Sequence, residues 1–253
     1  MLEHEYDTMR AVEDDYWWYR VLRAMTCREV VRATAGRSEA RVLDAGCGTG
    51  GTMAALRTVD PALRLSGIDV SPLALAHVRE RGFGDAREAS VEQLPCAESS
   101  QDAVVSLDVL YHEGVDEERA MREFLRVLKP GGTLIMNLPA FECLRGRHDE
   151  AVRGVRRYTA AGVRDLHARN GFQAERVFCW NAWLFLPVLI WRRASRRLSA
   201  AQTGEAVSDL AMPPAWLNAA AALVASADAA ACRAIRSPIG TSVFSVAKAV
   251  KTP

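Results

Sequence analysis

The sequence predicts a doubly wound α/β fold with a mostly parallel sheet, and three observations support this class. Short apolar segments alternate with segments of helical spacing between residues 40 and 140, as strands and crossover helices do. A glycine-rich turn at 46–51 lies between the first such strand and the first such helix, where nucleotide-like ligands bind. Nearly half of the 253 residues are apolar, which is enough for one large domain with additions.

Composition and charge restrict the function classes. A formal net charge of +1 argues against general nucleic-acid binding. Six cysteines are scattered without a Cys-x-x-Cys pair, which is typical of reduced cytosolic thiols rather than of disulfides or a zinc site, so we expect no metal. The charged N-terminus differs from a signal peptide, and the apolar run 182–191 is too short to span a bilayer. We therefore expect a soluble, cytoplasmic protein.

Residues 1–35 have a helical pattern and contain four consecutive aromatic side chains at 16–19. Four neighbouring aromatics cannot all face one core, so some of them are expected to cover a pocket or another segment. A helix that simply packs onto the main domain explains the same pattern, and both interpretations stay open.

The stretch 41–51 carries the strongest signal, a short apolar strand that ends in the carboxylate of Asp44 and continues into the glycines. Glycines there allow positive φ and let a ligand approach backbone amides. Three of them have the G-x-G-x-x-G spacing of NAD-binding folds, and Asp69, about twenty residues later, would suit a ribose. Against NAD, Asp44 would repel a pyrophosphate, whereas it attracts the ammonium group of S-adenosylmethionine.

The string Leu43-Asp44-Ala45-Gly46-Cys47-Gly48-Thr49-Gly50 closely resembles the first motif of the class I S-adenosylmethionine-dependent methyltransferases. The resemblance covers roughly residues 40–140 and implies a seven-stranded, mostly parallel, Rossmann-like sheet with an antiparallel last strand; the aromatic and apolar segments 1–35 and 181–240 add an expected helical cap. It also implies S-adenosyl-L-methionine as the cofactor. The cofactor contacts that it implies in this motif are Asp44, Ala45, Gly46, Cys47 and Gly48.

The end of the second strand, 65–69, supplies the next predicted contacts. Asp69, followed by Val70, is placed to accept both ribose hydroxyls, which a carboxylate does better than a neutral acceptor. The alternative role of Asp69 is to cap the helix that begins at Ser71-Pro72, where serine suits the cap and proline the first turn.

The third and fourth strands complete the predicted cofactor site. After a short strand at 86–90, the resemblance implies that Ser90 and the amide of Val91 hold the adenine edge; relatives commonly carry aspartate where Ser90 stands. The fourth strand, 102–108, brings Asp108 and Val109 to the border of the cofactor. We expect strands at 133–138, 173–180 and 242–247 to complete the sheet, the last one inserted antiparallel.

These elements define four expected segments. Residues 1–35 form an N-terminal helical lid, and 36–180 form the S-adenosylmethionine-binding core. Residues 181–240 form a helical cap insertion, and 241–253 contain the last strand of the core. We expect both helical segments to lie over the carboxyl ends of the strands, where doubly wound sheets bind ligands.

Three residues are candidates for acid–base chemistry. His112 and Tyr111 follow the fourth strand directly, and His112 is the better base because its unperturbed pKa is near neutrality. His148, next to Asp149, is a third candidate. A packing role for His112 and a solvated loop position for His148 are the alternatives.

Several residues are candidates for binding ligands outside the core motifs. The string Trp17-Trp18-Tyr19-Arg20 resembles the lid of many small-molecule methyltransferases, which implies Arg20 at the cofactor carboxylate and Trp18 near the acceptor. Residues 148–159 resemble a bacterial subgroup whose members act on natural products or on saccharide and lipid precursors.

Charge in the second half of the chain suggests how the acceptor is held. If residues 153–157 are helical, Arg153, Arg156 and Arg157 share one face beside Tyr158 and form a fork for an anionic acceptor. A solvated face paired with nearby carboxylates is the alternative. Four further arginines, at 192, 193, 196 and 197, follow an apolar run and suggest peripheral contact with a membrane.

The function that the sequence favours is in-line methyl transfer from S-adenosylmethionine to a small-molecule acceptor. An NAD-dependent oxidoreductase would need a hydride-site pair such as Tyr-x-x-x-Lys, which the sequence lacks. A non-catalytic S-adenosylmethionine-binding module would have little need for the lid and the insertion.

Overall fold

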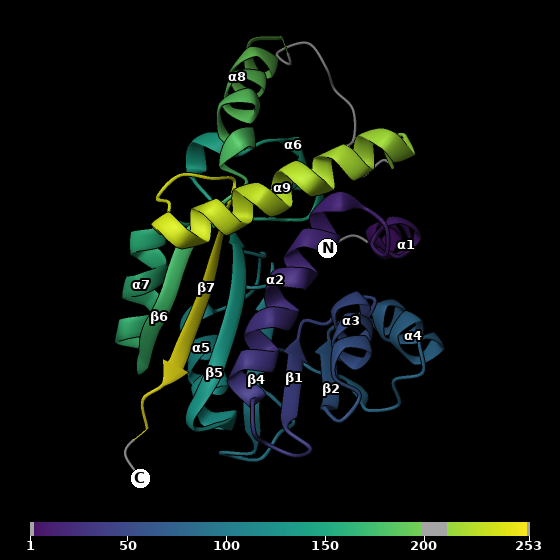
Figure 1. Ribbon diagram of the computed structural model, residues 1–253, viewed down its shortest axis with the longest axis vertical. Coiled ribbons are helices and arrows are strands. Elements are labelled where there is room, and N and C mark those ends of the chain that lie inside the picture. The colour runs from purple at the N-terminus through teal and green to yellow at the C-terminus, as the bar shows by residue number, and fades with distance from the viewer. Residues whose placement is uncertain (1–2, 199–211, 252–253) are drawn as a thin grey trace.

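The computed structural model describes residues 3–198 and 212–251, and its centre is a seven-stranded sheet (Figure 1). The strands are β1 (Arg41–Ala45), β2 (Arg64–Asp69), β3 (Ala86–Glu88), β4 (Gln101–Leu107), β5 (Leu128–Pro139), β6 (Phe172–Trp180) and β7 (Ser242–Ala249). Their order is β3-β2-β1-β4-β5-β7-β6, with β1 to β5 parallel to one another and β7 antiparallel to both of its neighbours. The predicted fold class is confirmed.

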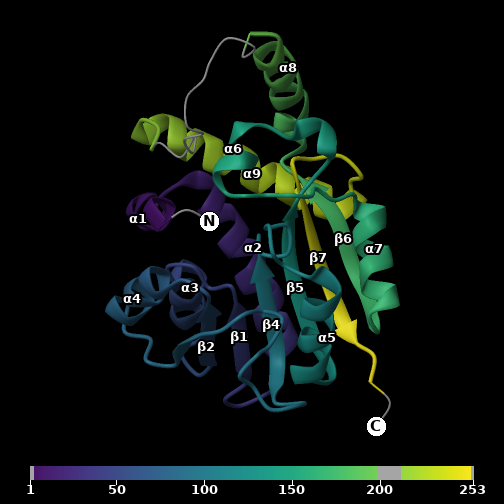
Figure 2. The ribbon, with the colours of Figure 1, turned by 180° about the vertical axis from the view of Figure 1, so that it is seen from behind.

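Helices cover both faces of this sheet (Figures 1 and 2). They are α1 (Glu3–Val12), α2 (Trp17–Thr34), α3 (Gly51–Val59), α4 (Pro72–Glu80), α5 (Glu117–Val127), the 3-10 turn η1 (Glu142–Leu144), α6 (Arg147–Ala151), α7 (Ala160–Arg169), α8 (Ala182–Leu198) and α9 (Ala215–Ile235). Because successive strand residues point to opposite faces, Leu43 packs in one core with α5 and α7, whereas Val42 packs in another with α2 and α9.

The N-terminal segment has two different roles. Along most of its length, α2 lies on the sheet and buries Val21, Met25 and Val30 in the core, so it is a structural layer rather than a lid. Only α1 and the beginning of α2 lie at the carboxyl ends of the strands. There Trp18 stacks on Trp180 of β6 with ring centroids 5.8 Å apart.

The insertion between β6 and β7 also has one helix that packs on the body of the protein and one that extends away from the sheet. α9 packs along α2 and β6, while α8 extends away from the sheet beyond α9 in both views (Figures 1 and 2). Asp228 of α9 accepts hydrogen bonds from the backbone N–H groups of Ala182 (3.2 Å) and Trp183 (3.3 Å), which lie at the start of α8. The two helices are therefore joined where α8 begins.

Candidate functional site

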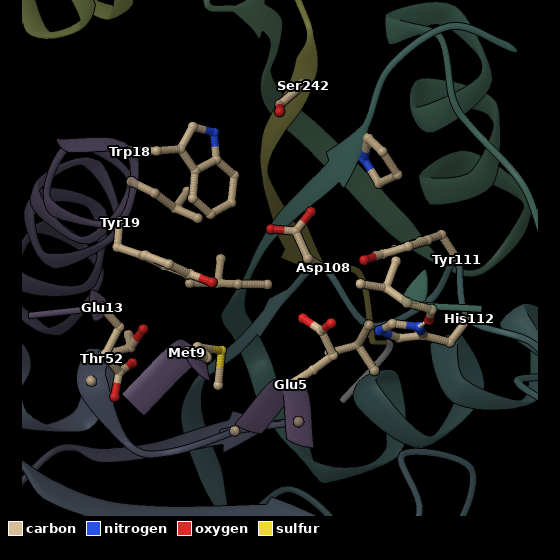
Figure 3. Close-up of a pocket in the computed structure, with 18 of the residues that line it drawn as sticks. Glu5, Met9, Glu13, Trp18, Tyr19, Thr52, Asp108, Tyr111, His112 and Ser242 are labelled. Carbon is tan, nitrogen blue, oxygen red and sulfur yellow. Dashed lines mark hydrogen bonds between the residues drawn. The ribbon is translucent and has the colours of Figure 1, made fainter. Parts of the chain in front are cut away.

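A cavity of about 580 Å³ lies at the carboxyl ends of β1, β2 and β4, under α1, the beginning of α2 and residues 184–192 of α8. This is the edge of a doubly wound sheet where ligands bind, and the volume is typical of small-molecule sites. Figure 3 shows part of the lining of the cavity. The lid and part of the insertion thus contribute to the cavity, whereas α9 does not.

The glycine turn after β1 forms the floor of the cavity. Gly46, Gly48 and Gly50 have φ values of 86°, 52° and 84°, which residues with a Cβ rarely adopt. A Cβ on Gly46 would collide with the side chain of Val109, so glycine is required there for space as well. A Cβ on Gly48 would lie 2.8 Å from Cε of Met9, which shows how closely α1 covers the turn.

Asp44 is a buried carboxylate beneath this turn. Its Oδ2 atom has no hydrogen-bond partner among the residues that the structure describes. Burial, reinforced by the negative charges of Asp69 and Glu13, raises the pKa of Asp44 to about 7. A buried carboxylate oxygen without a partner is costly, so this atom is suited to a cationic ligand.

Arg23, rather than Arg20, is the arginine of α2 that lines the cavity. Arg20 is exposed, which contradicts its predicted contact with the cofactor. The Nη2 group of Arg23 donates to the carbonyl of Asp14 at 2.9 Å, but its buried Nη1 group has no partner in the described part of the chain. A Cβ on Gly51 would lie 2.8 Å from Nη1, so this group is next to the N-terminus of α3.

Sequence reasoning could have identified Arg23 from helical spacing. Tyr19 and Arg23 are four residues apart, therefore lie on the same side of α2, and both line the cavity. Arg20 lies roughly a quarter turn from Tyr19 and points away from the pocket.

These residues fit S-adenosylmethionine. Its methionine end carries a carboxylate and an ammonium group, and two of the buried cavity atoms without partners in the described part of the chain, Arg23 Nη1 and Asp44 Oδ2, have the complementary charges. The N-terminus of α3, beside Arg23, adds a positive partial charge for the carboxylate.

Asp69 lies between the glycine turn, α1 and α4. Its Oδ2 atom accepts a hydrogen bond from the Gly48 N–H (2.9 Å), and Oδ1 accepts from the Ser71 N–H (3.0 Å) and the Tyr6 hydroxyl (3.2 Å). Burial raises the pKa of Asp69 although these hydrogen bonds oppose the shift. Asp69 therefore supports the loop that leads into α4, although Ser71 and not Asp69 is the N-cap of that helix, and it still faces the cavity where a ribose would bind.

The remaining predicted cofactor contacts divide into two groups. Ser90 lines the cavity, and its hydroxyl oxygen accepts a hydrogen bond from the Glu92 N–H at 3.1 Å. Ala45 does not line the cavity because it is fully buried in the core. The predicted residues that do line it are Asp44, Gly46, Cys47, Gly48, Asp69, Val70, Ser90, Val91, Asp108 and Val109.

Asp108 points into the cavity between Tyr19 and Tyr111 (Figure 3). Its φ of 55° is unusual for a residue with a side chain. Both carboxylate oxygens accept from Nδ2 of Asn137, at 3.1 and 2.9 Å, and burial raises the pKa of Asp108 to about 7. Because Trp180 Nε1 can only donate, its 2.9 Å bond to Asn137 Oδ1 fixes the amide orientation.

The predicted acid–base residues have different environments. His112 lines the cavity, and its Nδ1 is 2.7 Å from the carbonyl of Val152, so Nδ1 carries the proton in the neutral ring. Tyr111 stacks on that ring at 4.3 Å, and burial raises its pKa well above the usual value, so its hydroxyl stays protonated. The side chain of His148 lies outside the described part of the structure.

The predicted arginine fork is wrong because the helix that it requires ends at Ala151. Arg153 is exposed with a φ of 53°. Arg156 donates to the carbonyl of Val115 at 3.1 Å, and neither of these arginines lines the cavity. Arg157 does line it, but its guanidinium is paired with both carboxylate oxygens of Asp149, at 2.8 and 3.1 Å.

Tyr158 also differs from the prediction. Its hydroxyl donates to Glu117 at 2.7 Å, and its ring is buried in the core rather than in the cavity. By contrast, Trp18, for which we predicted a position near the acceptor, lines the cavity.

Carboxylates dominate the charged lining of the cavity, which favours a cationic ligand over an anionic one. The carboxylates are Glu5, Glu13, Asp44, Asp69, Asp108, Glu113 and Asp149, and the cations are Arg23, Arg157 and Arg192.

Sequence comparison relates this site to known proteins. Residues 43–136 match a family model described as a methyltransferase domain. Over 166 residues the chain is 31% identical to a protein of Mycolicibacterium smegmatis named as a probable S-adenosylmethionine-dependent methyltransferase, covering 64% of this chain and 62% of that protein. Over 120 residues it is 36% identical to the demethylmenaquinone methyltransferase of Chlorobaculum parvum, 47% of each. The chain thus spans about half to three fifths of these relatives.

Solved structures show the same fold. A methyltransferase solved with the Haloferax volcanii Trm112 activator matches with a TM-score of 0.63 at 19% identity, covering 100% of this chain and 99% of that one. Geranyl diphosphate C-methyltransferase from Streptomyces coelicolor, solved with S-adenosyl-L-homocysteine, matches with a TM-score of 0.60 at 16% identity, covering 90% and 76%. Residues 43–136 therefore match a methyltransferase domain, the sheet has the fold of the solved methyltransferases, and S-adenosyl-L-methionine is the cofactor that these similarities support.

Proposed function

We propose that this chain transfers a methyl group from S-adenosylmethionine to a small-molecule acceptor in the cytoplasm. The observation that carries the proposal is the pair of buried, unpartnered atoms, Arg23 Nη1 and Asp44 Oδ2, in one cavity with the glycine turn. Asp69 would hold the ribose, and Ser90 and Val91 would border the adenine.

When bound, the cofactor supplies an electrophilic methyl group on a positively charged sulfur. The residues of this chain then align the acceptor, exclude water and, for a hydroxyl or amine, accept its proton. α1 and Trp18 are placed to exclude water because they cover the cavity at the strand ends.

Asp108 is our first candidate for accepting the proton. It faces the cavity, its carboxylate is fixed by Asn137, and its pKa of about 7 suits a base that works near neutral pH. His112 is the second candidate because its protonated Nδ1 leaves the lone pair on Nε2.

We propose a natural product or a saccharide or lipid precursor as the acceptor. Two relatives, demethylmenaquinone methyltransferase and geranyl diphosphate C-methyltransferase, have names that refer to small-molecule acceptors. The site does not favour an anionic acceptor bound by arginines, since Arg156 donates to the carbonyl of Val115 and Arg157 is paired with Asp149.

Two experiments test this function. Calorimetry with S-adenosylmethionine should give saturable binding, and NAD should give none. Incubation with S-adenosylmethionine and extracts of small molecules should then produce S-adenosylhomocysteine only when an acceptor is present. Cofactor binding without turnover on any extract would instead favour a non-catalytic binding module.

A further inference from the structure

The outer side of α9 is an exposed apolar helix face. Trp216 and Leu223 are each 74% exposed, and Ile235 is 75% exposed. The exposed positions between them at helical spacing are almost all alanine, so a strip along about 30 Å of helix carries no charge. The outer face of a helix in a soluble protein normally carries charged or polar residues.

α8 also has an exposed apolar face. Its exposed residues Leu186 and Ile190 are four apart and therefore share a face, with Trp183 one turn earlier and Trp191 beside it. Ile190 and Trp191 are 66% and 67% exposed. The start of α8 is held against α9 by hydrogen bonds to Asp228, so the two helices that carry these apolar faces meet at one corner of the molecule.

The contacts of α9 with the rest of the protein decide whether this helix could span a bilayer or lie on its surface. α9 is long and apolar enough to cross a membrane by length and composition. However, Ala225, Ala229 and Cys232 on its inner side are buried against α2 and β6, and Asn218 bonds to the backbone of Asp15 and Trp17. A helix fixed along one side in this way lies flat on a surface and does not span a bilayer.

The charges at this corner select an anionic surface. Within 182–194 and 215–235 the single carboxylate is Asp228, and its oxygens are directed at the start of α8. Exposed arginines, Arg193 on α8 and Arg236 after α9, flank the apolar faces. Tryptophan and arginine beside aliphatic residues are typical of helices that lie in the interface of anionic bilayers.

We propose that the outer faces of α8 and α9 form a docking surface for an anionic lipid bilayer. The other face of α8 relates this docking surface to the active-site cavity, because Leu184, Val188 and Arg192 line the cavity. One helix therefore contacts the bilayer and borders the site, which suits an acceptor with a lipid chain. The acceptor class rests on the proposed function, but membrane binding does not.

The test uses the full chain and vesicles of phosphatidylcholine with or without phosphatidylserine. We expect sedimentation with the anionic vesicles, little with the neutral ones, and weaker binding as salt rises. Leu223→Glu should lower the partition coefficient at least tenfold, and Arg193→Glu should lower it on anionic vesicles. Val59→Glu is the matched control, since Val59 is also exposed but lies on α3, and it should bind as the unchanged protein does.

Cofactor calorimetry on each variant separates the two proposals. Leu223→Glu should keep its affinity for S-adenosylmethionine, which also shows that it is folded. The docking surface is overturned if the unchanged chain sediments with neither kind of vesicle, or if Leu223→Glu and Val59→Glu bind equally. A dimer that Leu223→Glu dissociates, without vesicle binding, would assign the face to a second copy of the chain.

Discussion

The carboxylate of Asp108 accepts two hydrogen bonds from the side-chain amide of Asn137, so the ends of β4 and β5 hold one cavity-facing group in a fixed orientation. Trp180 of β6 orients that amide in turn. Three strands thus position a single carboxylate whose backbone has an unfavourable φ. Strain of this kind persists where the surrounding structure over-determines a conformation, often at functional sites.

Asp108→Asn should lower kcat about 10²- to 10⁴-fold, the usual contribution of a general base, while cofactor affinity stays unchanged. In the unchanged enzyme, protonation of Asp108 below its pKa of about 7 should reduce kcat as the pH falls. Steady-state measurements of kcat between about pH 5.5 and 8.5 check both points, because kcat should change most within about one pH unit of the pKa. His112→Gln is the companion variant, and a loss of kcat in it but not in Asp108→Asn would assign the base to the histidine.

Arg23→Ala should weaken binding of S-adenosylmethionine by about 1.5–3 kcal/mol, the scale for hydrogen bonds to charged groups. The reason is that Arg23 presents a buried, unpartnered N–H group beside the N-terminus of α3. Arg20→Ala removes the same charge from the same helix at an exposed position, so calorimetry should find its affinity nearly unchanged. Equal losses in the two variants would show that only the overall charge of α2 matters.

Asp44 should make both stability and cofactor affinity depend on pH. Its folded pKa of about 7 is above the value for an unfolded aspartate, so its contribution to the free energy of unfolding is full below about pH 4 and is lost as the pH rises through 7. Affinity for the cationic cofactor should rise over the upper part of that range because the ionised carboxylate binds it. Thermal denaturation and calorimetry of Asp44→Asn should show a reduced pH dependence of both quantities; Asp108 contributes a remaining dependence of the same sign.

The sequence predicted the sheet and most of the residues found at the glycine turn and strand ends of the cavity, because both depend on local patterns. Alternating strands and helices, the glycine turn and the carboxylates at strand ends can be recognised within a few residues of the chain. The choice between Arg20 and Arg23 depends instead on how α2 is rotated on the sheet, which is set by packing of residues such as Val30.

Two other features also depend on tertiary structure, so the sequence did not predict them. Asp108 directly follows β4, Asn137 is on β5 and Trp180 is on β6, so their hydrogen bonds follow from the completed sheet. The predicted arginine fork assumed that a helix continues past Ala151, but the chain turns at Arg153, and Gly154 pairs with His112. Charge spacing alone did not reveal that turn.

Asp69 has two roles that a pair of variants can separate. Asp69→Ala removes the predicted ribose acceptor and also the acceptor for the Gly48 and Ser71 N–H groups. We expect it to lower cofactor affinity by about 1.5–3 kcal/mol and to lower the thermal midpoint as well.

Ser71→Ala serves as the control because the Ser71 hydroxyl accepts from the Ala74 N–H at the start of α4 and does not line the cavity. Loss of that cap should cost about 1 kcal/mol of folding free energy with cofactor affinity unchanged. Calorimetry and thermal denaturation on both variants give the comparison. If Asp69→Ala lowers stability only as Ser71→Ala does and binds the cofactor normally, Asp69 serves only to hold the loop before α4 and the ribose is held by other residues.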